Sequence, residues 1–516
     1  MLSYTYSAGL NGIDGYLVTV ECYSTKGVPS FEIVGLPDNA IKEAKDRVRS
    51  AIVSCHYSMP NQKIVVNLAP ADQKKEGTSF DLAIMISLLI GNITALPSSK
   101  KLEDCCFIGE VSLSGAIRPV RGVLCMVLAA KEAGKKNIFV PEANVKEAGA
   151  VKGVNIYGVD TIGAIVSHFA EVTPLVPYTH VEEDYESKAV YPDFRDVLGQ
   201  FLPRRGAEIA AAGGHNMLLI GPPGTGKSMI AKRIPSILPE MTLEESLETT
   251  KVHSVSGILP EGVSLVRERP FRSPHHTMSA VSLSGGGRNP VPGEISLATN
   301  GVLFLDELPE FNRSVIDALR QPLEDGKITI TRVAGRVTYP STFMLVCAMN
   351  PCKCGYYGHP TRECTCTRQE IRKYVAKVSG PLLDRMDIQV EVPAINYGEL
   401  AKGKAEESSE DIRIRVNKAR EIMKKRFAGE TNDSGIPISC NGQMEPRHLR
   451  KYCALSPECS QIMEQAYTVM GLSARGHDRV LRVARTIADL DGSEEILVKH
   501  LAEALQYRGL DKKYFK

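Results

Sequence analysis

Short apolar runs alternate with amphipathic stretches through most of this chain, and this pattern predicts a mixed α/β protein. Near the N-terminus, the β-branched runs Tyr16–Val20 and Lys63–Leu68 predict strands. Between them, Asp38–Val53 predicts a helix with Asp38 as its N-cap. The apolar residues of that helix recur at helical spacing and predict one buried face: Ile41, Ala44, Val48 and Ile52.

A second α/β unit follows in the same region. Cys106–Val111 and Asn137–Val140 predict strands, and they flank a helix predicted from about Val123 to Ala133. The longest apolar run, Leu82–Ile90, is only about half as long as a membrane span. We therefore predict a buried helix there and no contact with a membrane.

The length of 516 residues is too great for one hydrophobic core and indicates several domains. Prolines and acidic residues are concentrated in 171–192, which predicts a linker. We therefore expect an α/β domain over 1–170, a nucleotide-binding core over 193–395 and an all-helical lid over 396–516. Helices are predicted in the lid at Asp411–Phe427, Val480–Leu490 and Ile496–Gln506.

A glycine-rich motif lies between the apolar run Met217–Ile220 and the helical stretch Met229–Ile234. This strand, loop and helix context is the one that a phosphate-binding loop requires, because backbone N–H groups and the helix dipole then meet at the phosphates. The motif predicts a site for ATP and Mg²⁺, in which Lys227 reaches the β- and γ-phosphates and the Ser228 hydroxyl ligates Mg²⁺. The nucleotide-binding residues expected here are Gly221, Gly224, Thr225, Gly226, Lys227 and Ser228.

Two further strands end in polar residues. The apolar run after Gly301 ends in Asp306 and Glu307, and Phe343–Met349 ends in Asn350. Asp306 can hold the Mg²⁺ shell, Glu307 can polarise the attacking water, and the Asn350 amide can orient that water or contact the γ-phosphate. The alternative for the acidic pair is two solvated carboxylates at a strand end, and for Asn350 a turn residue.

Four of the thirteen cysteines are clustered after Asn350, as two C-x-C pairs. Cysteines in a chain without an export signal favour a reducing, cytoplasmic location, with free thiols or metal ligands in place of disulfides. Four thiolates on a short loop can bind Zn²⁺ tetrahedrally in a structural site. The predicted ligands are Cys352, Cys354, Cys364 and Cys366, with free thiols as the alternative.

The formal net charge is only +2, so contact with nucleic acid would require local basic patches. The alternating segment Lys327–Thr338 predicts a hairpin that carries Lys327, Arg332 and Arg336. Those cations would bind DNA phosphates without sequence preference, although a solvated hairpin remains the alternative. The segment Asp411–Phe427 predicts a basic helix, and its composition favours a solvated face over a contact with DNA.

The phosphate loop, the acidic strand end and Asn350 together resemble the AAA+ core, with Asn350 at the sensor-1 position and the hairpin at the pre-sensor-1 position. The segment Ser379–Asp387 resembles the arginine-finger segment of the magnesium-chelatase and MCM branch. This resemblance implies that Arg385 acts on the ATP of a neighbouring subunit, a salt bridge to Asp384 or Asp387 being the alternative. The segment Leu472–Arg479 resembles sensor 2, for which we choose Arg475 over Arg479.

The N-terminal region resembles the Lon-protease/S5-like fold through Asn67–Asp81 and Ala116–Gly122. Ser79 falls where Lon-like proteases have their nucleophile, but Leu124 falls where they have the catalytic lysine. A serine without a base is a poor nucleophile, so we expect a catalytically inactive domain.

Nearly the whole chain resembles the ComM/YifB family of magnesium-chelatase-like AAA+ ATPases, most specifically through Pro270–Thr277, Gly285–Gly287 and Pro292–Ala298. The resemblance implies a homo-hexameric motor on branched, single-stranded or double-stranded DNA, a helicase that promotes branch migration during recombination and natural transformation. Recombination proteins are the implied partners. The alternative is an ATPase that remodels a protein or metal-chelatase partner; no D-x-S-x-S motif is present, so a companion would be a separate chain.

Overall fold

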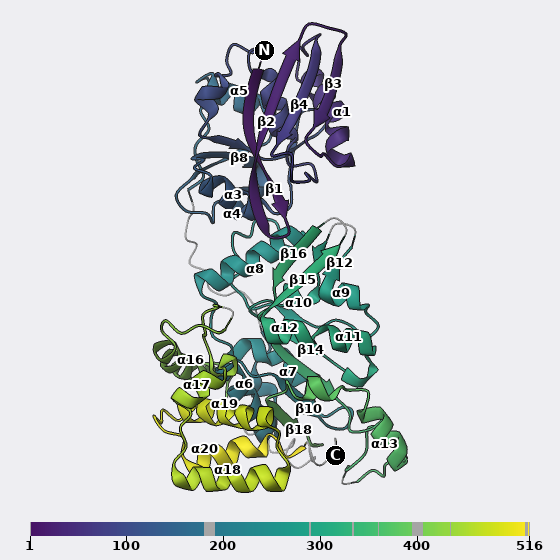
Figure 1. Cartoon of the computed structure of the whole chain (residues 1–516), viewed down its shortest axis with the longest axis vertical. Helices are drawn as coiled ribbons and strands as arrows, with labels where there is room; N and C mark the ends of the chain where they lie inside the picture. Colours follow the sequence, from purple (N-terminus) through teal and green to yellow (C-terminus); the bar gives the residue numbers. More distant parts are fainter. Residues whose placement is uncertain are drawn as a thin grey trace.

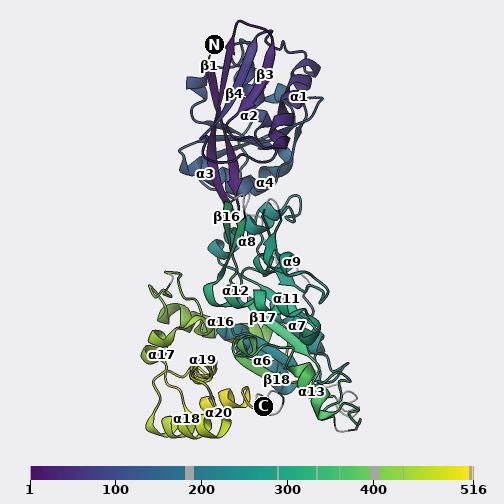
Figure 2. The same cartoon turned by 45° about the vertical axis from the view of Figure 1, so that its right-hand side comes forward.

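A computed structural model describes residues 2–179, 191–287, 290–332, 335–359, 361–394, 406–433, 435–510 and 514. The molecule is elongated, with the N-terminal α/β region at one end, a parallel-sheet region in the middle and a helical region beside it at the other end (Figures 1 and 2). Residues 180–190 of the predicted linker 171–192 and residues 395–405 at the predicted boundary near 395 lie outside the described residues. Among the helices of the described part, none is both long and apolar enough to cross a membrane.

The first sheet of the N-terminal region has the strand order β1-β2-β4-β3. These strands are β1 (Leu2–Asn11), β2 (Asp14–Thr25), β3 (Ser30–Val34) and β4 (Lys63–Ala69). Helix α1 (Asn39–Ser54) begins where the Asp38 carboxylate accepts a hydrogen bond from the Ile41 N–H at 2.9 Å, and its four predicted apolar residues are buried. This confirms the predicted cap and face. Every residue of α2 (Asp81–Leu89) is buried, as its apolar run predicted.

The second N-terminal sheet has the order β5-β8-β9, formed by Cys105–Phe107, Asn137–Pro141 and Asn155–Val159. The predicted strand Cys106–Val111 is wrong in its extent, because the chain leaves β5 and starts a separate pair, β6 (Glu110–Val111) with β7 (Ile117–Arg118). The helices of this unit are α3 (Val123–Glu132), α4 (Val145–Ala148) and α5 (Ile162–Phe169).

The middle region is built on a five-stranded parallel sheet of order β11-β14-β17-β10-β18. The strands are Phe271–Arg272, Val302–Leu305, Met344–Met349, Met217–Ile220 and Ile388–Glu391. All residues of β10, β14 and β17 are buried, as expected of strands covered on both faces. The helices of this region are α6 (Phe201–Gly213), α7 (Lys227–Ile237), α8 (Leu243–Ser256), α9 (Ala280–Ser284), α10 (Glu294–Leu297), α11 (Arg313–Ala318), α12 (Arg320–Asp325), α13 (Arg368–Val375) and α14 (Gly380–Leu383).

Two small antiparallel pairs extend from the middle region toward the N-terminal region. They are β12 (Gly285–Gly286) with β13 (Val291–Pro292), and the hairpin of β15 (Lys327–Arg332) with β16 (Gly335–Pro340). The second pair confirms the predicted hairpin, whose residues 333–334 lie outside the described residues.

The N-terminal region contacts the middle region at the β1–β2 turn and at α3. At the turn, Gly12 lies so close to β16 that an added Cβ would be 2.2 Å from Val337 Cγ1. Ile13 packs against the apolar cluster that contains Val337 and Tyr339. Helix α3 packs on α8, and the Ser254 hydroxyl of α8 donates to the Glu147 carboxylate of α4.

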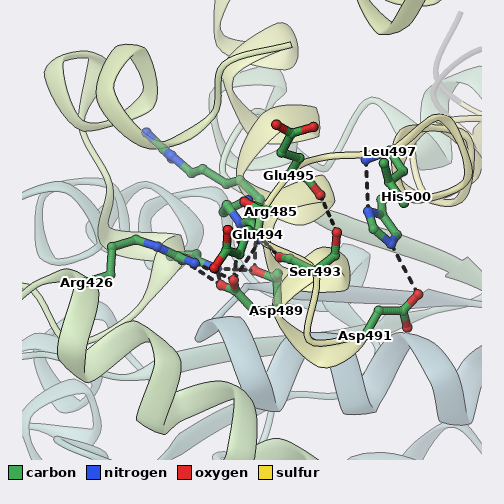
Figure 3. Close-up of polar contacts among 12 residues, drawn as sticks. Arg426, Arg485, Asp489, Asp491, Ser493, Glu494, Glu495, Leu497 and His500 are labelled. Atoms are coloured by element: carbon green, nitrogen blue, oxygen red, sulfur yellow. Dashed lines mark hydrogen bonds and ion pairs between the residues drawn. The ribbon is translucent and has the colours of Figure 1, made fainter. Parts of the chain in front are cut away.

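The C-terminal region consists of α16 (Ser409–Arg426), α17 (Pro446–Tyr452), α18 (Pro457–Met470), α19 (Ala474–Leu490) and α20 (Val498–Gln506). Buried Asp489 on α19 holds this region together, as Figure 3 shows. It accepts from Arg426 of α16 at 2.6 Å, from Arg485 at 3.1 Å and from Asn441 Nδ2 at 2.8 Å. These contacts fix α19 against α16.

The basic helix α16 is solvated only in part. Lys418, Lys424 and Lys425 are exposed, as expected. Arg415, by contrast, forms ion pairs with Glu208 and Glu407, and Arg426 pairs with Asp489. The expected solvated face is therefore wrong for these arginines, because acidic residues from other elements lie opposite them.

Candidate nucleotide-binding site

The phosphate loop joins β10 to α7 at the carboxyl edge of the parallel sheet. Gly224 and Gly226 adopt φ angles of 77° and 89°, in the left-handed region that glycine tolerates. Lys227 Nζ donates to the carbonyl oxygens of Gly221 and Pro222, each at 2.7 Å, and to Asn350 Oδ1 at 3.1 Å. Burial lowers the pKa of the Lys227 ammonium to about 8, although Asp306 and Glu307 act in the opposite direction.

The Ser228 hydroxyl donates to Asp306 Oδ2 at 2.5 Å, so the two predicted Mg²⁺ groups face each other. Asp306 directly follows β14, and Asn350 directly follows β17, the strand between β14 and β10. The carboxyl ends of neighbouring parallel strands therefore bring together the residues that the sequence predicted for phosphate and Mg²⁺. A serine hydroxyl and a carboxylate are oxygen ligands of the kind that Mg²⁺ takes, and the loop and Lys227 suit a triphosphate.

Glu307 lies at the edge of this group. Its φ angle is 53°, a left-handed conformation that is unusual for a residue other than glycine. Its side chain is 56% exposed, and its carboxylate lies 3.4 Å from His276 Nδ1. No local pattern in the sequence indicated that His276 lies beside Glu307.

Arg385 and Arg475 lie apart from the phosphate loop, in the lining of a single pocket. Both line a pocket of about 440 Å³ between the middle and C-terminal regions. Of the described residues, those lining it include no member of the phosphate loop. The pocket is rich in guanidinium groups, contributed by Arg269, Arg385, Arg420, Arg475, Arg479 and Arg482.

The Arg385 side chain forms an ion pair with Glu324 and donates to the Pro381 carbonyl at 2.6 Å. The alternative raised from the sequence was a salt bridge to Asp384 or Asp387. It is wrong, because the acidic partner of Arg385 is Glu324. Glu324 lies on α12, and nothing local to the Arg385 segment indicated it.

Arg475 and Arg479 differ in accessibility. Arg475 is exposed in the first turn of α19. Arg479 is 7% exposed, and its Nε lies 3.3 Å from Asp387 Oδ1. Asp387 in turn contacts His215 Nδ1 at 3.2 Å, so Arg479 belongs to a buried network. Of the two, Arg475 is therefore the more accessible side chain.

Several pocket arginines have nitrogen atoms without a hydrogen-bond acceptor. Among the described buried side chains, these include Nε of Arg385, Arg420 and Arg482 and Nη1 of Arg479. An unpaired buried donor costs about 1–3 kcal/mol. Because six arginines line the pocket, it is suited to an anion with many oxygen atoms.

The β15–β16 hairpin has one apolar and one polar face. Ile328, Ile330, Val337 and Tyr339 are buried, whereas Lys327 and Arg336 are exposed on the opposite face. Arg332 pairs with Gly335 in the register, and its side chain lies outside the described residues.

The four predicted metal ligands converge. The sulfur atoms of Cys352, Cys354, Cys364 and Cys366 all lie within 4.8 Å of one another, and three of the separations are 3.3, 3.5 and 3.7 Å. Four sulfurs bound at about 2.3 Å to one tetrahedral ion would be about 3.8 Å apart. The geometry therefore fits one ion; a multi-iron cluster would hold its cysteine sulfurs farther apart.

The N-terminal residues that resemble a protease site do not form one. Ser79 is 4% exposed and its hydroxyl donates to the Ala8 carbonyl at 3.4 Å. Leu124 is fully buried in an apolar cluster. These positions therefore serve packing.

Models of known protein families match most of the chain. The family model for magnesium chelatase, subunit ChlI, matches residues 193–400, and the models for subunit ChlI of Mg-chelatase and for the ChlI C-terminal region match 20–144 and 406–508. A Lon protease of Brucella suis biovar 1 is 26% identical over 202 residues, covering 37% of this chain and 24% of that protein.

Two relatives match over nearly the full length. The uncharacterized protein YifB of Escherichia coli K12 is 42% identical over 519 residues, and the competence protein ComM of Haemophilus influenzae is 41% identical over 517 residues. Each alignment covers 99% of this chain and 98% of the relative. The chain therefore belongs to the ComM/YifB family of magnesium-chelatase-like AAA+ proteins.

Proposed function

We propose that this chain is the subunit of a cytoplasmic, homo-hexameric ATPase that moves along DNA, a helicase that promotes branch migration when incoming strands recombine. The name of the Haemophilus relative, a competence protein, supports this setting. Branched DNA, with its single-stranded and double-stranded arms, is the proposed substrate, and recombination proteins are the proposed partners.

The observation that carries the proposal is the division of the catalytic groups between two sites on one chain. Lys227, Ser228, Asp306 and Asn350 lie together, whereas Arg385 and Arg475 line a different pocket. ATP hydrolysis needs positive charge at the γ-phosphate. Head-to-tail association would bring the arginine pocket of one subunit to the phosphate loop of the next, and such contacts close into a ring.

In this ring, Lys227 contacts the β- and γ-phosphates, and Ser228 and Asp306 hold Mg²⁺. Glu307 polarises the attacking water and Asn350 orients it. Arg385 and Arg475 of the adjacent subunit stabilise the charge that develops on the phosphoryl group.

The β15–β16 hairpin is the proposed DNA contact, through Lys327, Arg332 and Arg336. Lys327 and Arg336 are exposed on its polar face, while its apolar face is buried against the middle region. A ring of such hairpins would neutralise backbone phosphates without reading base sequence.

The test is the ATPase rate with and without forked or four-way-junction DNA at two salt concentrations. We expect DNA to stimulate ATP hydrolysis, and we expect the stimulation to weaken with salt and to be lost in a Lys327/Arg332/Arg336 triple alanine variant. Each lost phosphate contact should lower by about 1 the slope of log DNA affinity against log salt concentration. The matched control is a Lys418/Lys424/Lys425 triple alanine variant, which removes the same charge from exposed positions of α16. Equal loss in both variants would contradict a specific role for the hairpin.

A second candidate is an ATPase that remodels a protein or metal-chelatase partner. The observation that favours it is the match of three magnesium-chelatase models along the chain. Healthy turnover that no DNA stimulates would favour this candidate over the DNA motor.

We also propose that the four-cysteine cluster holds a structural Zn²⁺. Four sulfur ligands around one tetrahedral ion are the set that zinc prefers in closed sites. Metal analysis of reduced, chelator-free protein should find one zinc per chain, and an absence of zinc would remove the site.

A further inference from the structure

The four-cysteine loop lies directly on the phosphate loop. It begins two residues after Asn350, at Cys352, which is fully buried. Gly355, inside the loop, has a φ angle of 86°, and a Cβ added to it would lie 2.6 Å from Cδ of Pro223. Pro223 belongs to the phosphate loop, so the cysteine loop supports that loop from outside.

The same loop is continuous with the residue that contacts Lys227. Asn350 accepts a hydrogen bond from Lys227 Nζ at 3.1 Å, and only Pro351 separates it from the first cysteine. The position of the Asn350 amide therefore depends on where the chain is anchored at Cys352. The Gly355 N–H donates to the Cys352 carbonyl at 3.0 Å, which turns the chain back directly after the first cysteine.

We propose that the metal held by these four cysteines is a structural part of the ATP site, which positions Pro223 and Asn350 for nucleotide binding. The inference rests on the proposed ATPase function and the proposed zinc site. Without the ion, four thiolates at this separation repel one another, and the loop loses the constraint that keeps Gly355 against Pro223. Nucleotide binding then becomes dependent on metal occupancy.

The contact between Gly355 and Pro223 can be tested without touching a metal ligand. Gly355→Ala keeps all four thiols but places a methyl group against Pro223. Gly358→Ala is the matched control, because Gly358 lies in the same loop with a φ angle of 77°, and its added Cβ would meet only the Tyr514 hydroxyl, at 4.0 Å. Both substitutions strain the backbone to a similar degree, so only the clash with Pro223 differs.

The experiment measures zinc content and the Kd of a fluorescent ATP analogue for each purified full-length protein. We expect Gly355→Ala to retain zinc and to bind the analogue about 10- to 100-fold more weakly, as a displaced contact loop would. Gly358→Ala should match the unmodified chain. Equal affinities of the two variants, or equal losses, would overturn the inference.

Cys364→Ser supplies the second arm, with Cys55→Ser in the N-terminal region as its control. We expect Cys364→Ser to lose zinc and analogue affinity together, with unfolding of the N-terminal region unchanged. A protein that lost zinc and kept its affinity would overturn the coupling while leaving the ATPase function intact. An unmodified chain that held zinc but bound no nucleotide would overturn the proposed function itself.

Discussion

At the scale of single residues, Lys227 is buried and donates to three oxygen acceptors. Its pKa of about 8 means that a growing fraction of Lys227 is neutral above that pH. Bound phosphates favour the ammonium form, so ATP binding must then take up a proton.

We expect the Kd for ATP to be flat below about pH 8 and to rise above it, by at most about tenfold per pH unit. Titrations with a fluorescent analogue between about pH 7 and 9.5 measure the slope. Calorimetry in two buffers of different ionisation enthalpy measures the proton uptake directly. A Kd that did not change across this range would show that Lys227 stays charged throughout.

Glu307→Gln should slow hydrolysis by about 10²- to 10⁴-fold and leave ATP binding intact, because an amide cannot polarise water as a carboxylate does. Single-turnover hydrolysis and analogue binding, measured side by side, separate the two effects. His276→Ala is the companion variant, since His276 contacts the Glu307 carboxylate but reaches no phosphate-loop residue among its described contacts. Unimpaired hydrolysis by Glu307→Gln would remove the assigned role.

Local sequence was enough to predict the cluster of Lys227, Ser228, Asp306 and Asn350. Asp306 and Asn350 directly follow apolar strands, and Lys227 and Ser228 begin the helix after the glycine-rich loop. The local sequence was not enough to predict the contacts that Glu324 and His276 make. Each meets its partner only through the tertiary fold, Glu324 across 61 positions from Arg385. Charged residues that are isolated in sequence carry no local sign of such a contact.

At the scale of elements, the position of Arg475 depends on α19, and α19 is fixed by Asp489. Asp489→Asn should destabilise the packing of α19 on α16 by about 3–5 kcal/mol, because Arg426 and Arg485 would lose a buried carboxylate. Hydrogen exchange of the α16 and α19 amides measures this local free energy, which a single unfolding temperature of a long chain does not.

The control for this change is Asp491→Asn on the same segment (Figure 3). Asp491 pairs with Lys499 at 2.6 Å and His500 at 3.1 Å, and its side chain is 35% exposed. Asp491→Asn should lower the local free energy of unfolding by no more than about 1 kcal/mol, as for other exposed ion pairs. If both variants lost the same amount of hydrogen-exchange protection in α16 and α19, the central role of Asp489 would be contradicted.

Elements were predictable where apolar periodicity was strong, as in α1, α2, β10 and the β15–β16 hairpin. The sequence was less informative for Cys106–Val111, where one apolar run supplies two strands of different sheets. It was also misleading for Arg415 and Arg426 of α16, because a basic helix looks solvated until the acidic residues of other elements are in place.

At the scale of the whole molecule, the separation of the arginine pocket from the phosphate loop predicts complementation between subunits. Arg385→Ala and Glu307→Gln chains should each be inactive alone. Mixed in equal amounts, they should regain activity at up to about one quarter of the sites, where an intact Glu307 meets an intact Arg385. The ATPase rate of the mixture measures this directly.

The control is each variant mixed with itself at the same total concentration, which should stay inactive. If the mixture also stayed inactive while both variants assembled and bound ATP, Arg385 would not act on a neighbour. Recovery of activity would support a shared site without any assumption about ring size.

The contact between the β1–β2 turn and β16 gives the N-terminal region a mechanical consequence. Strands of ten and twelve residues form an arm roughly 30 Å long, which runs from the basic hairpin into the N-terminal sheet. A paired two-stranded arm is stiff along its length, so force applied to the hairpin is transmitted to the far end of the molecule. A domain in which Ser79 and Leu124 are buried in packing can therefore act as a lever on any motion of the hairpin.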